Sequence, residues 1–247
     1  MHITGIIPAR YSSTRFPGKP LAMIHGQSMI QRVYMQCTLS ALTDILVATD
    51  DERIHEHVLG FGGKSIMTSE AHHSGTDRCL EAIDRSAIVT AAVINVQGDE
   101  PFIQPGQINR IIELLTRPEV RIATLAIAIE DPMWLQDRNK VKVICDRHDK
   151  AIYFSRTPIP FQKDHAPETW THHFRYLKHV GIYGFQLETL RELCALDPSP
   201  LEKAESLEQL RWIENGYSIH LSETDQESPS VDTPEDLERI LALYNKK

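Results

Sequence analysis

A basic, hydroxyl-rich segment near the N-terminus is the first candidate for chemistry. Residues 10–19 contain Arg10, Arg15 and Lys19, together with three consecutive hydroxyl side chains at 12–14. The segment follows an apolar run over 3–9, so its cations would converge at the end of a buried strand. Arginine and lysine side chains are the usual means of holding phosphate oxygens in proteins. The pattern therefore fits a phosphate-binding loop, and it also fits an ordinary solvated basic loop.

Two carboxylates further along the chain could hold a magnesium ion beside a triphosphate. Asp99 follows an apolar run over 91–96, although an ordinary Gly-Asp turn would give the same pattern. Asp232 precedes a helix that Thr233 can cap, with Asp236 completing a capping box. Because Thr233 takes the capping role, the carboxylate of Asp232 is free to be a second metal ligand.

A third candidate is the segment 73–78, His-Ser-Gly-Thr-Asp-Arg, which precedes a predicted helix. The hydroxyls of Ser74 and Thr76 and the backbone N–H groups of the helix N-terminus could meet a nucleotide. The adjacent histidines at 72 and 73 are weak metal candidates, and a surface turn is the preferred interpretation of His72.

Several common motifs are excluded by single residues. The N-terminal loop is not a Walker A loop, because Ser13 stands where a glycine is required and Pro20 replaces Ser or Thr. The glycines of 60–63 are not a dinucleotide fingerprint, since they follow a helix and Ser65 replaces the last glycine. We interpret that run as a helix stop.

The first half of the chain alternates apolar runs with amphipathic stretches, which predicts an α/β fold with a mainly parallel sheet flanked by helices. Ligands of such sheets bind outside the carboxyl ends of the strands, where the candidate segments lie. The expected strands cover 3–9, 44–49, 64–68 and 91–96, and the expected helices cover 28–39, 50–59, 76–85 and a stretch starting at 105.

The second half predicts a mixed sheet. Residues 161–174 are polar and are expected to form a loop, and Gly216 is expected to end a helix. We therefore predict one domain over 1–247 with a smaller mixed-sheet sub-domain at about 130–215. The expected strands cover 122–129, 141–145, 151–155, 179–185 and 217–221, and the expected helices cover 202–215 and 234–244.

Composition restricts the partners and the compartment. The net charge is −8 and the basic residues are scattered, which argues against nucleic acid or an anionic membrane as the main partner. No signal peptide and no apolar span of 18 residues is visible, so the cytoplasm is expected. The cysteines lie far apart without a CxxC pair and are expected to be buried, reduced thiols: Cys37, Cys79, Cys145 and Cys194.

Taken together, these segments resemble the 3-deoxy-manno-octulosonate (Kdo) cytidylyltransferase family. The resemblance runs in the family's order over almost the whole chain. The matching stretches are IIPARYSSTRFPGKPL (6–21), ILVATDD (45–51), HSGTDR (73–78), VINVQGDEPFI (93–103), AIYFSRTPIP (151–160), KHVGIYGF (178–185), SPLEKAESLEQLR (199–211) and VDTPEDLERI (231–240).

The resemblance implies a nucleotide-diphospho-sugar transferase-like fold with a smaller dimerisation sub-domain, and therefore a homodimer. It implies the reaction of CTP with Kdo to give CMP-Kdo and pyrophosphate, dependent on Mg²⁺, in lipopolysaccharide synthesis. Arg10, Lys19, Asp99 and Asp232 are the expected catalytic residues, with Asp99 and Asp232 as the metal ligands.

The resemblance also implies the binding residues. Arg10 and Lys19 are expected on the phosphates, and Arg156 on the carboxylate of Kdo. The expected nucleotide-binding residues are Pro8, Ala9, Arg10, Arg15, Lys19, Ser74, Gly75, Thr76, Arg78 and Gln97. The expected sugar-binding residues are Gln97, Arg156, His179, Tyr183, Glu208 and Gln209.

Departures from the family pattern are mild and bear on the sugar's fine structure: Phe16, Lys178 and Phe185. The alternatives are a cytidylyltransferase for another acidic sugar, such as 8-amino-Kdo or sialic acid, or a catalytically silent CTP-binding regulator. An NAD-dependent oxidoreductase is disfavoured by the missing glycine fingerprint.

Overall fold

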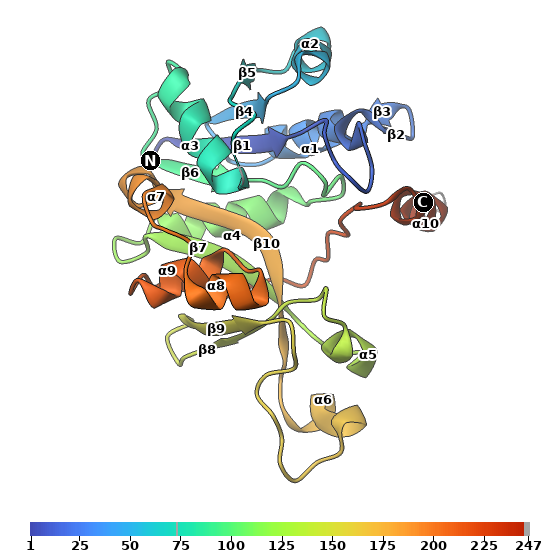
Figure 1. The fold of residues 1–247 in the computed structure, drawn as a ribbon, viewed down its shortest axis with the longest axis vertical. Helices are drawn as coiled ribbons and strands as arrows, with labels where there is room; N and C mark the ends of the chain where they lie inside the picture. Colours follow the sequence, from blue (N-terminus) through green and yellow to red (C-terminus); the bar gives the residue numbers. More distant parts are fainter. Residues whose placement is uncertain (73, 245–247) are drawn as a thin grey trace. The chain divides into compact units, whose positions relative to one another are not determined.

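The computed structural model describes residues 1–72 and 74–244. They form two compact units (Figure 1). Unit 1 is Met1–Ile112 with Glu227–Lys247, and unit 2 is Glu113–Gln226. The sub-domain expected at about 130–215 stays a prediction.

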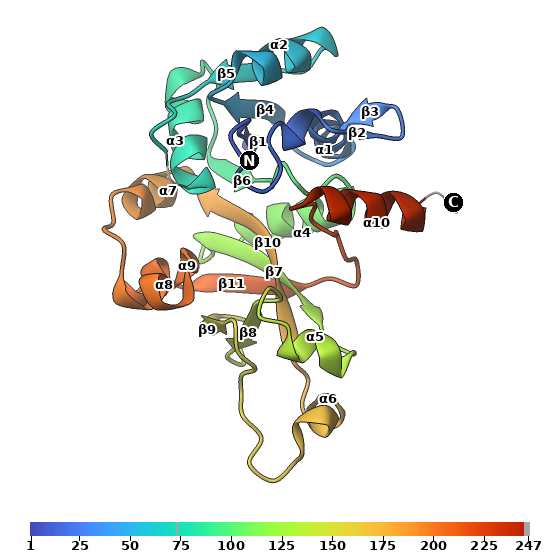
Figure 2. The same cartoon turned by 45° about the vertical axis from the view of Figure 1, so that its right-hand side comes forward.

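Unit 1 is built on four parallel strands in the order β6-β1-β4-β5. They are β1 (Ile3–Ala9), β4 (Asp44–Thr49), β5 (Ser65–Met67) and β6 (Ala92–Asn95). Strand β1 is buried along almost its whole length, as expected for a strand covered on both faces. Because the strands are parallel, the segments after Ala9, Thr49 and Asn95 leave the sheet at the same edge (Figures 1 and 2).

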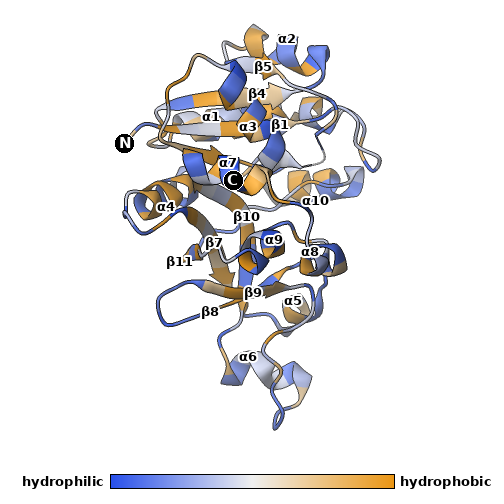
Figure 3. Cartoon of the chain, turned by 60° about the vertical axis from the view of Figure 1, so that its left-hand side comes forward, coloured by the Kyte–Doolittle hydropathy of each residue, from blue (hydrophilic) through white to orange (hydrophobic). Residues whose placement is uncertain are grey.

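The helices of unit 1 begin where polar side chains cap them. Ser28, Asp51 and Ser74 each accept a hydrogen bond from a backbone N–H of the following turn. Hydrophobic and hydrophilic colours alternate around α2 and α4 in Figure 3, as expected for helices with one buried face. The helices are α1 (Met29–Thr38), α2 (Glu52–Gly60), α3 (Gly75–Arg85), α4 (Pro105–Leu115) and α10 (Pro234–Tyr244).

A small hairpin and the C-terminal segment share an apolar cluster in unit 1. The hairpin joins β2 (Met23–Ile24) to β3 (Gln27–Ser28) through His25 and Gly26, both at positive φ. The cluster anchors the chain before α10 against the loop that follows β6. Its buried members are Ile24, Met29, Phe102, Val231 and Ile240.

Unit 2 contains a mixed sheet in which β7 (Ile122–Ala128) pairs parallel with β11 (Ile219–Glu223) and antiparallel with β10 (Leu177–Gln186). The register of β10 against β7 shifts between Val180 and Tyr183, which marks a bulge. Strands β8 (Lys142–Cys145) and β9 (Ala151–Ser155) form an antiparallel pair, and β8 also pairs with β10. The short helices are α5 (Pro132–Gln136), η2 (Pro167–Thr169), α6 (Trp170–His173), α7 (Leu187–Cys194), α8 (Pro200–Glu205) and α9 (Gln209–Glu214).

The predicted α/β class, with a mainly parallel sheet flanked by helices and a mixed-sheet part, is confirmed. The single helix expected over 202–215 is wrong, because the chain breaks between α8 and α9 at Ser206, which has φ +52°. The loop expected over 161–174 contains η2 and α6. Helices α5 and α7 were not predicted.

The four cysteines are free thiols, as expected, but only Cys37 and Cys79 are fully buried. Cys145 and Cys194 are partly exposed, so the expectation of burial is wrong for these two. No helix among residues 1–72 and 74–244 is long and apolar enough to cross a membrane. The glycines after α2 stop that helix as predicted, with Gly62 at φ +84°.

Candidate active site

The N-terminal basic loop is folded back on itself by its own backbone. The N–H groups of Ser13 and Gly18 both donate to the carbonyl of Tyr11, each at 2.9 Å. Gly18 has φ +71°, and a Cβ there would lie 3.1 Å from the Tyr11 ring, so only glycine fits without strain. The Arg53 guanidinium lies 3.3 Å from the centre of the same ring. This turn places Lys19 at the first position of the short helix η1 (Lys19–Leu21).

The structure brings Lys19, Asp99 and Asp232 together. The Lys19 ammonium donates to Asp99 Oδ2 at 2.8 Å and to Asp232 Oδ1 at 3.3 Å. Arg15 reaches the same oxygen of Asp232 at 3.2 Å. Lys19 is largely buried, with 14% of its side chain exposed, whereas Asp99 and Asp232 keep 30% and 38%. Two partly open carboxylates therefore face one cation, although 133 positions separate them in sequence.

Asp232 reaches this position because the segment before α10 is tied to the loop after β6. The Val231 N–H donates to the Asp99 carbonyl at 2.9 Å, and the Ser228 hydroxyl donates to Glu100 Oε2 at 2.7 Å. Thr233 and Asp236 form the reciprocal hydrogen bonds of the predicted capping box. The Asp232 carboxylate takes no part in the cap, as predicted, and is left for Lys19 and Arg15.

The geometry of Asp99 and Asp232 is suited to a divalent cation. Both carboxylates lie within hydrogen-bonding distance of the Lys19 ammonium, so their oxygens are close to one another. A metal ion beside Lys19 could therefore take an oxygen ligand from each carboxylate. In the described part of the chain, no group of three or more His, Cys, Asp and Glu residues could hold a metal. Mg²⁺ suits such a site, because it is commonly bound by one or two carboxylates plus substrate phosphates and water.

Two glycines allow neighbouring segments to close on Pro8 at the end of β1. A Cβ at Gly98 would lie 2.7 Å from the Pro8 carbonyl oxygen, so a side chain there would push the Asp99 loop away. A Cβ at Gly75 would lie 3.3 Å from Pro8 and from the Asn95 side chain. The absence of side chains at both positions thus sets how closely α3 and the Asp99 loop approach β1.

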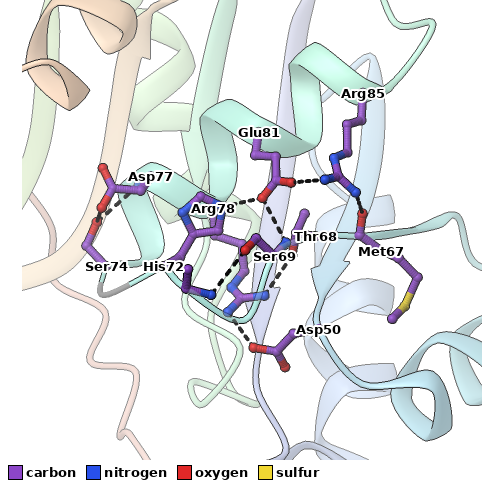
Figure 4. A network of polar contacts seen from close by, with 11 residues as sticks. Asp50, Met67, Thr68, Ser69, His72, Ser74, Asp77, Arg78, Glu81 and Arg85 are labelled. Carbon is purple, nitrogen blue, oxygen red and sulfur yellow. Dashed lines mark hydrogen bonds and ion pairs between the residues drawn. The ribbon is translucent and has the colours of Figure 1, made fainter.

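Arg78, expected at the nucleotide, is fully buried and supports the site from within (Figure 4). Its guanidinium donates to Asp50 Oδ2 at 2.6 Å and to the Thr68 hydroxyl at 2.7 Å. Asp50 follows β4, and Thr68 follows β5. Arg78 therefore ties α3 to the carboxyl edge of two strands, and its Nε has no partner in the described structure.

Arg10, in the N-terminal basic loop, has no anionic partner among the described residues. Burial, and after it the positive charge of Arg78, lower the pKa of Arg10, while the charges of Asp50 and Asp77 oppose that shift. In residues 1–72 and 74–244, Arg10 makes no hydrogen bond or ion pair. A partly buried guanidinium without a fixed partner is well placed to receive an anion.

The remaining nucleotide candidates are mostly engaged in local structure. The Ser74 hydroxyl accepts from the Asp77 N–H and donates to the Asp77 carboxylate, and the Thr76 side chain is buried. The Gln97 amide lies 3.5 Å from Asn95 Oδ1, a long contact that leaves it available. His72, expected in a surface turn, contacts the Glu81 carboxylate, and the histidine at 73 lies outside the described residues (Figure 4).

The other predicted sugar residues belong to unit 2. Arg156 donates to three backbone carbonyls, those of Glu205 at 2.7 Å and of Arg138 and Ser206 at 3.2 Å. These acceptors are neutral, so the guanidinium is fixed in place while its positive charge is not cancelled by them. Gln209 is buried at the start of α9, directly after Glu208.

His179 and Tyr183 form a ring contact in unit 2, with centroids 5.1 Å apart. Burial, and after it the positive charge of Lys178, lower the pKa of His179 from the ordinary 6.5 to about 3. Burial, and after it the charge of Glu208, raise the pKa of Tyr183 well above 10. Both side chains are therefore neutral at physiological pH.

The lowered pKa of His179 predicts a pH-dependent stability. As the pH falls from about 6.5 to about 3, the unfolded chain binds a proton at this position and the folded chain does not. The free energy of unfolding should therefore drop by about 1.4 kcal/mol per pH unit through this window from His179 alone. Denaturant titrations of the unaltered protein and of His179→Gln between pH 7 and 4 give the free energy of unfolding as a function of pH. The unaltered protein should show the steeper dependence, and equal slopes for the two proteins would refute the prediction.

Sequence reasoning missed several residues that build these sites. Asp50 lies in a segment expected at the sheet edge, but its pairing with Arg78 was not foreseen. Ser228 and Thr68 carry no local signal, because their partners lie far along the chain or on another strand. Thr124, which contacts His179, was likewise not identified.

Comparisons with known proteins agree with this geometry. A family model described as Cytidylyltransferase matches residues 4–222. The chain is 51% identical over 240 residues to a 3-deoxy-manno-octulosonate cytidylyltransferase of Cytophaga hutchinsonii and 50% identical to that of Bacteroides thetaiotaomicron, with 96% of each chain covered.

A solved structure of a CMP:2-keto-3-deoxy-manno-octonic acid synthetase complexed with CTP superposes with a TM-score of 0.92. It is 40% identical, with 100% of this chain and 99% of that chain covered. The resemblance seen in the sequence segments is thereby confirmed. The chain belongs to the 3-deoxy-manno-octulosonate cytidylyltransferases, a family of nucleotidyltransferases.

Proposed function

We propose that this chain transfers the cytidylyl group of CTP to Kdo, giving CMP-Kdo and pyrophosphate for lipopolysaccharide synthesis in the cytoplasm. The observation that carries the proposal is the meeting of Asp99 and Asp232 at Lys19, beside the basic loop. The names of relatives that match along nearly their full length support the sugar and the nucleotide. The family resemblance further supports a homodimer, with small molecules rather than nucleic acid or membrane as substrates.

The proposed chemistry is an in-line displacement at the α-phosphorus of CTP. The anomeric hydroxyl of Kdo loses its proton to water as its oxygen forms the new bond to phosphorus. The bond from phosphorus to the bridging oxygen of pyrophosphate breaks. Arg10 and Lys19 neutralise charge on the departing phosphates, and Arg156 holds the Kdo carboxylate. Positioning and charge neutralisation supply most of the rate acceleration in phosphoryl-group transfers of this kind.

We propose that Asp99 and Asp232 hold Mg²⁺. When bound, this ion would lower the repulsion between the attacking oxygen and the phosphate and acidify the sugar hydroxyl. Lys19 would then hold the two carboxylates in position while its charge also faces the triphosphate. Arg15 would play the same supporting role for Asp232 from the solvent side, where 64% of its side chain is exposed.

Pyrophosphate release tests the function directly. The protein is incubated with CTP and Mg²⁺ and with Kdo, 8-amino-Kdo or sialic acid in turn. We expect turnover with Kdo that is abolished by EDTA and restored by added Mg²⁺. Turnover only with another acidic sugar would show that this sugar, and not Kdo, is the substrate. Binding of CTP without pyrophosphate release from any sugar would instead support a silent CTP-binding protein.

A further inference from the structure

Thr124 lies in the middle of β7, with none of its surface exposed, opposite the bulge of β10. Its hydroxyl lies 2.7 Å from the Ile182 carbonyl, 3.3 Å from the Val180 carbonyl and 3.0 Å from His179 Nε2. Bulges commonly re-aim side chains next to functional sites. Here the bulge brings two carbonyls and one imidazole to a single hydroxyl.

The contacts of this hydroxyl favour one of the two neutral tautomers of His179. A threonine hydroxyl has one hydrogen, and the two carbonyls can only accept. The hydrogen therefore goes to the Ile182 carbonyl, which is the shortest contact, and the oxygen is left as an acceptor for His179. In this arrangement neutral His179 carries its proton on Nε2, and Nδ1 presents a lone pair.

Two polar atoms beside this contact have no partner. In the described part of the chain the hydrogen bond of His179 is made by Nε2, and its Nδ1, on a partly exposed side chain, makes none. Tyr183 Oη is buried without any hydrogen bond. An unpaired buried polar group costs about 1–3 kcal/mol, so such groups commonly await a ligand or water. Nδ1 accepts, while the Tyr183 hydroxyl can donate, which together match the hydroxyl groups of a sugar.

We propose that Thr124 is a positioning residue for sugar recognition: it locks His179 in the Nε2–H tautomer, so that His179 Nδ1 and Tyr183 Oη bind hydroxyl groups of the acceptor sugar. The inference rests on the proposed function and on the family resemblance, which implies that His179 and Tyr183 bind the sugar. The recognition is of neutral hydroxyls, in contrast to the charge-based recognition of the carboxylate by Arg156. A purely structural role, in which Thr124 only satisfies the bulge carbonyls, is the competing explanation.

The test compares Thr124→Val, which removes the hydroxyl, with Thr124→Ser, which keeps it. We expect Thr124→Val to raise KM for Kdo about tenfold, with KM for CTP changed less than twofold, and Thr124→Ser to restore KM for Kdo. Thr189→Val is the matched control, because Thr189 is a buried threonine of α7 that hydrogen-bonds Arg121. It should leave KM for Kdo unchanged.

A second measurement does not depend on activity or on a stable valine variant. Nitrogen-15 chemical shifts of His179 in the unaltered protein should report the Nε2–H tautomer, and Thr124→Val should shift the signal toward a mixture. The Nδ1–H tautomer in the unaltered protein would overturn the proposal, as would equal rises of KM for CTP and Kdo in Thr124→Val. Failure of the unaltered protein to use Kdo would refute the proposed function and, with it, the assignment of the sugar. The nitrogen shifts would still decide whether Thr124 sets the tautomer.

Discussion

Replacing Asp99 with asparagine should lower kcat for pyrophosphate release on the order of 10²–10³-fold while leaving the fold intact. The substitution keeps the size of the side chain and removes its charge. The amide oxygen of the asparagine could still accept from the Lys19 ammonium, but the negative charge at 2.8 Å would be gone. The pair of anionic oxygens that could hold a divalent cation would then no longer exist. The same variant should require more Mg²⁺ for half-maximal rate.

The measurement is steady-state turnover of CTP and Kdo over a range of Mg²⁺ concentrations, with thermal unfolding followed in parallel. Asp197→Asn is the matched control, because Asp197 is an exposed aspartate of unit 2 with no place in the proposed site. Its kinetics should equal those of the unaltered protein. A near-normal kcat in Asp99→Asn would show that Asp99 is not a metal ligand needed for the reaction.

Local sequence signals were sufficient wherever a feature depends on neighbouring residues. The cap of α10 is one case: Thr233 and Asp236 bond reciprocally, as a capping box requires, and Asp232 is left out of it. The buried strand β1 is another, because its unbroken apolar run is typical of a strand covered on both faces. The edge of the sheet where the candidate site residues lie followed from the same pattern.

Features that depend on distant residues were not predictable in this way. The helical periodicity of 202–215 continues through Ser206, but Glu202 pairs with Arg211 across the break and the chain turns between them. The position of Asp232 beside Lys19 depends on a backbone bond from Val231 to Asp99, for which no sequence spacing gives a signal. The family resemblance identified Lys19, Asp99 and Asp232 as candidate site residues, and the structure adds their contacts.

Asp50 supplies the second large expected effect, this time on stability. Among the described residues, its carboxylate is the only acidic group that pairs with Arg78, and the Arg78 side chain is 0% exposed. Removing one member of a buried ion pair leaves an uncompensated charge and costs about 3–5 kcal/mol. Asp50→Asn should therefore lower the free energy of unfolding by about that amount in urea titration.

Asp44→Asn is the matched control for this stability effect. Asp44 pairs with Lys64, whose side chain is 61% exposed, and an exposed pair of this kind is worth about 0–1 kcal/mol. If both variants lose the same small amount, the Arg78–Asp50 pair does not have the energetic role that its burial indicates.

A double-mutant cycle separates the ion pair from other effects of the substitutions. Arg78→Met should be costly alone, because it leaves the Asp50 carboxylate and the Thr68 hydroxyl without their donor. The double variant Asp50→Asn with Arg78→Met has no unpaired buried charge, so its loss should be smaller than the sum of the single losses. Additive losses would show that the two side chains act independently. A large coupling energy would show that α3 is held to the edge of β4 and β5 mainly by this pair, beside the open guanidinium of Arg10.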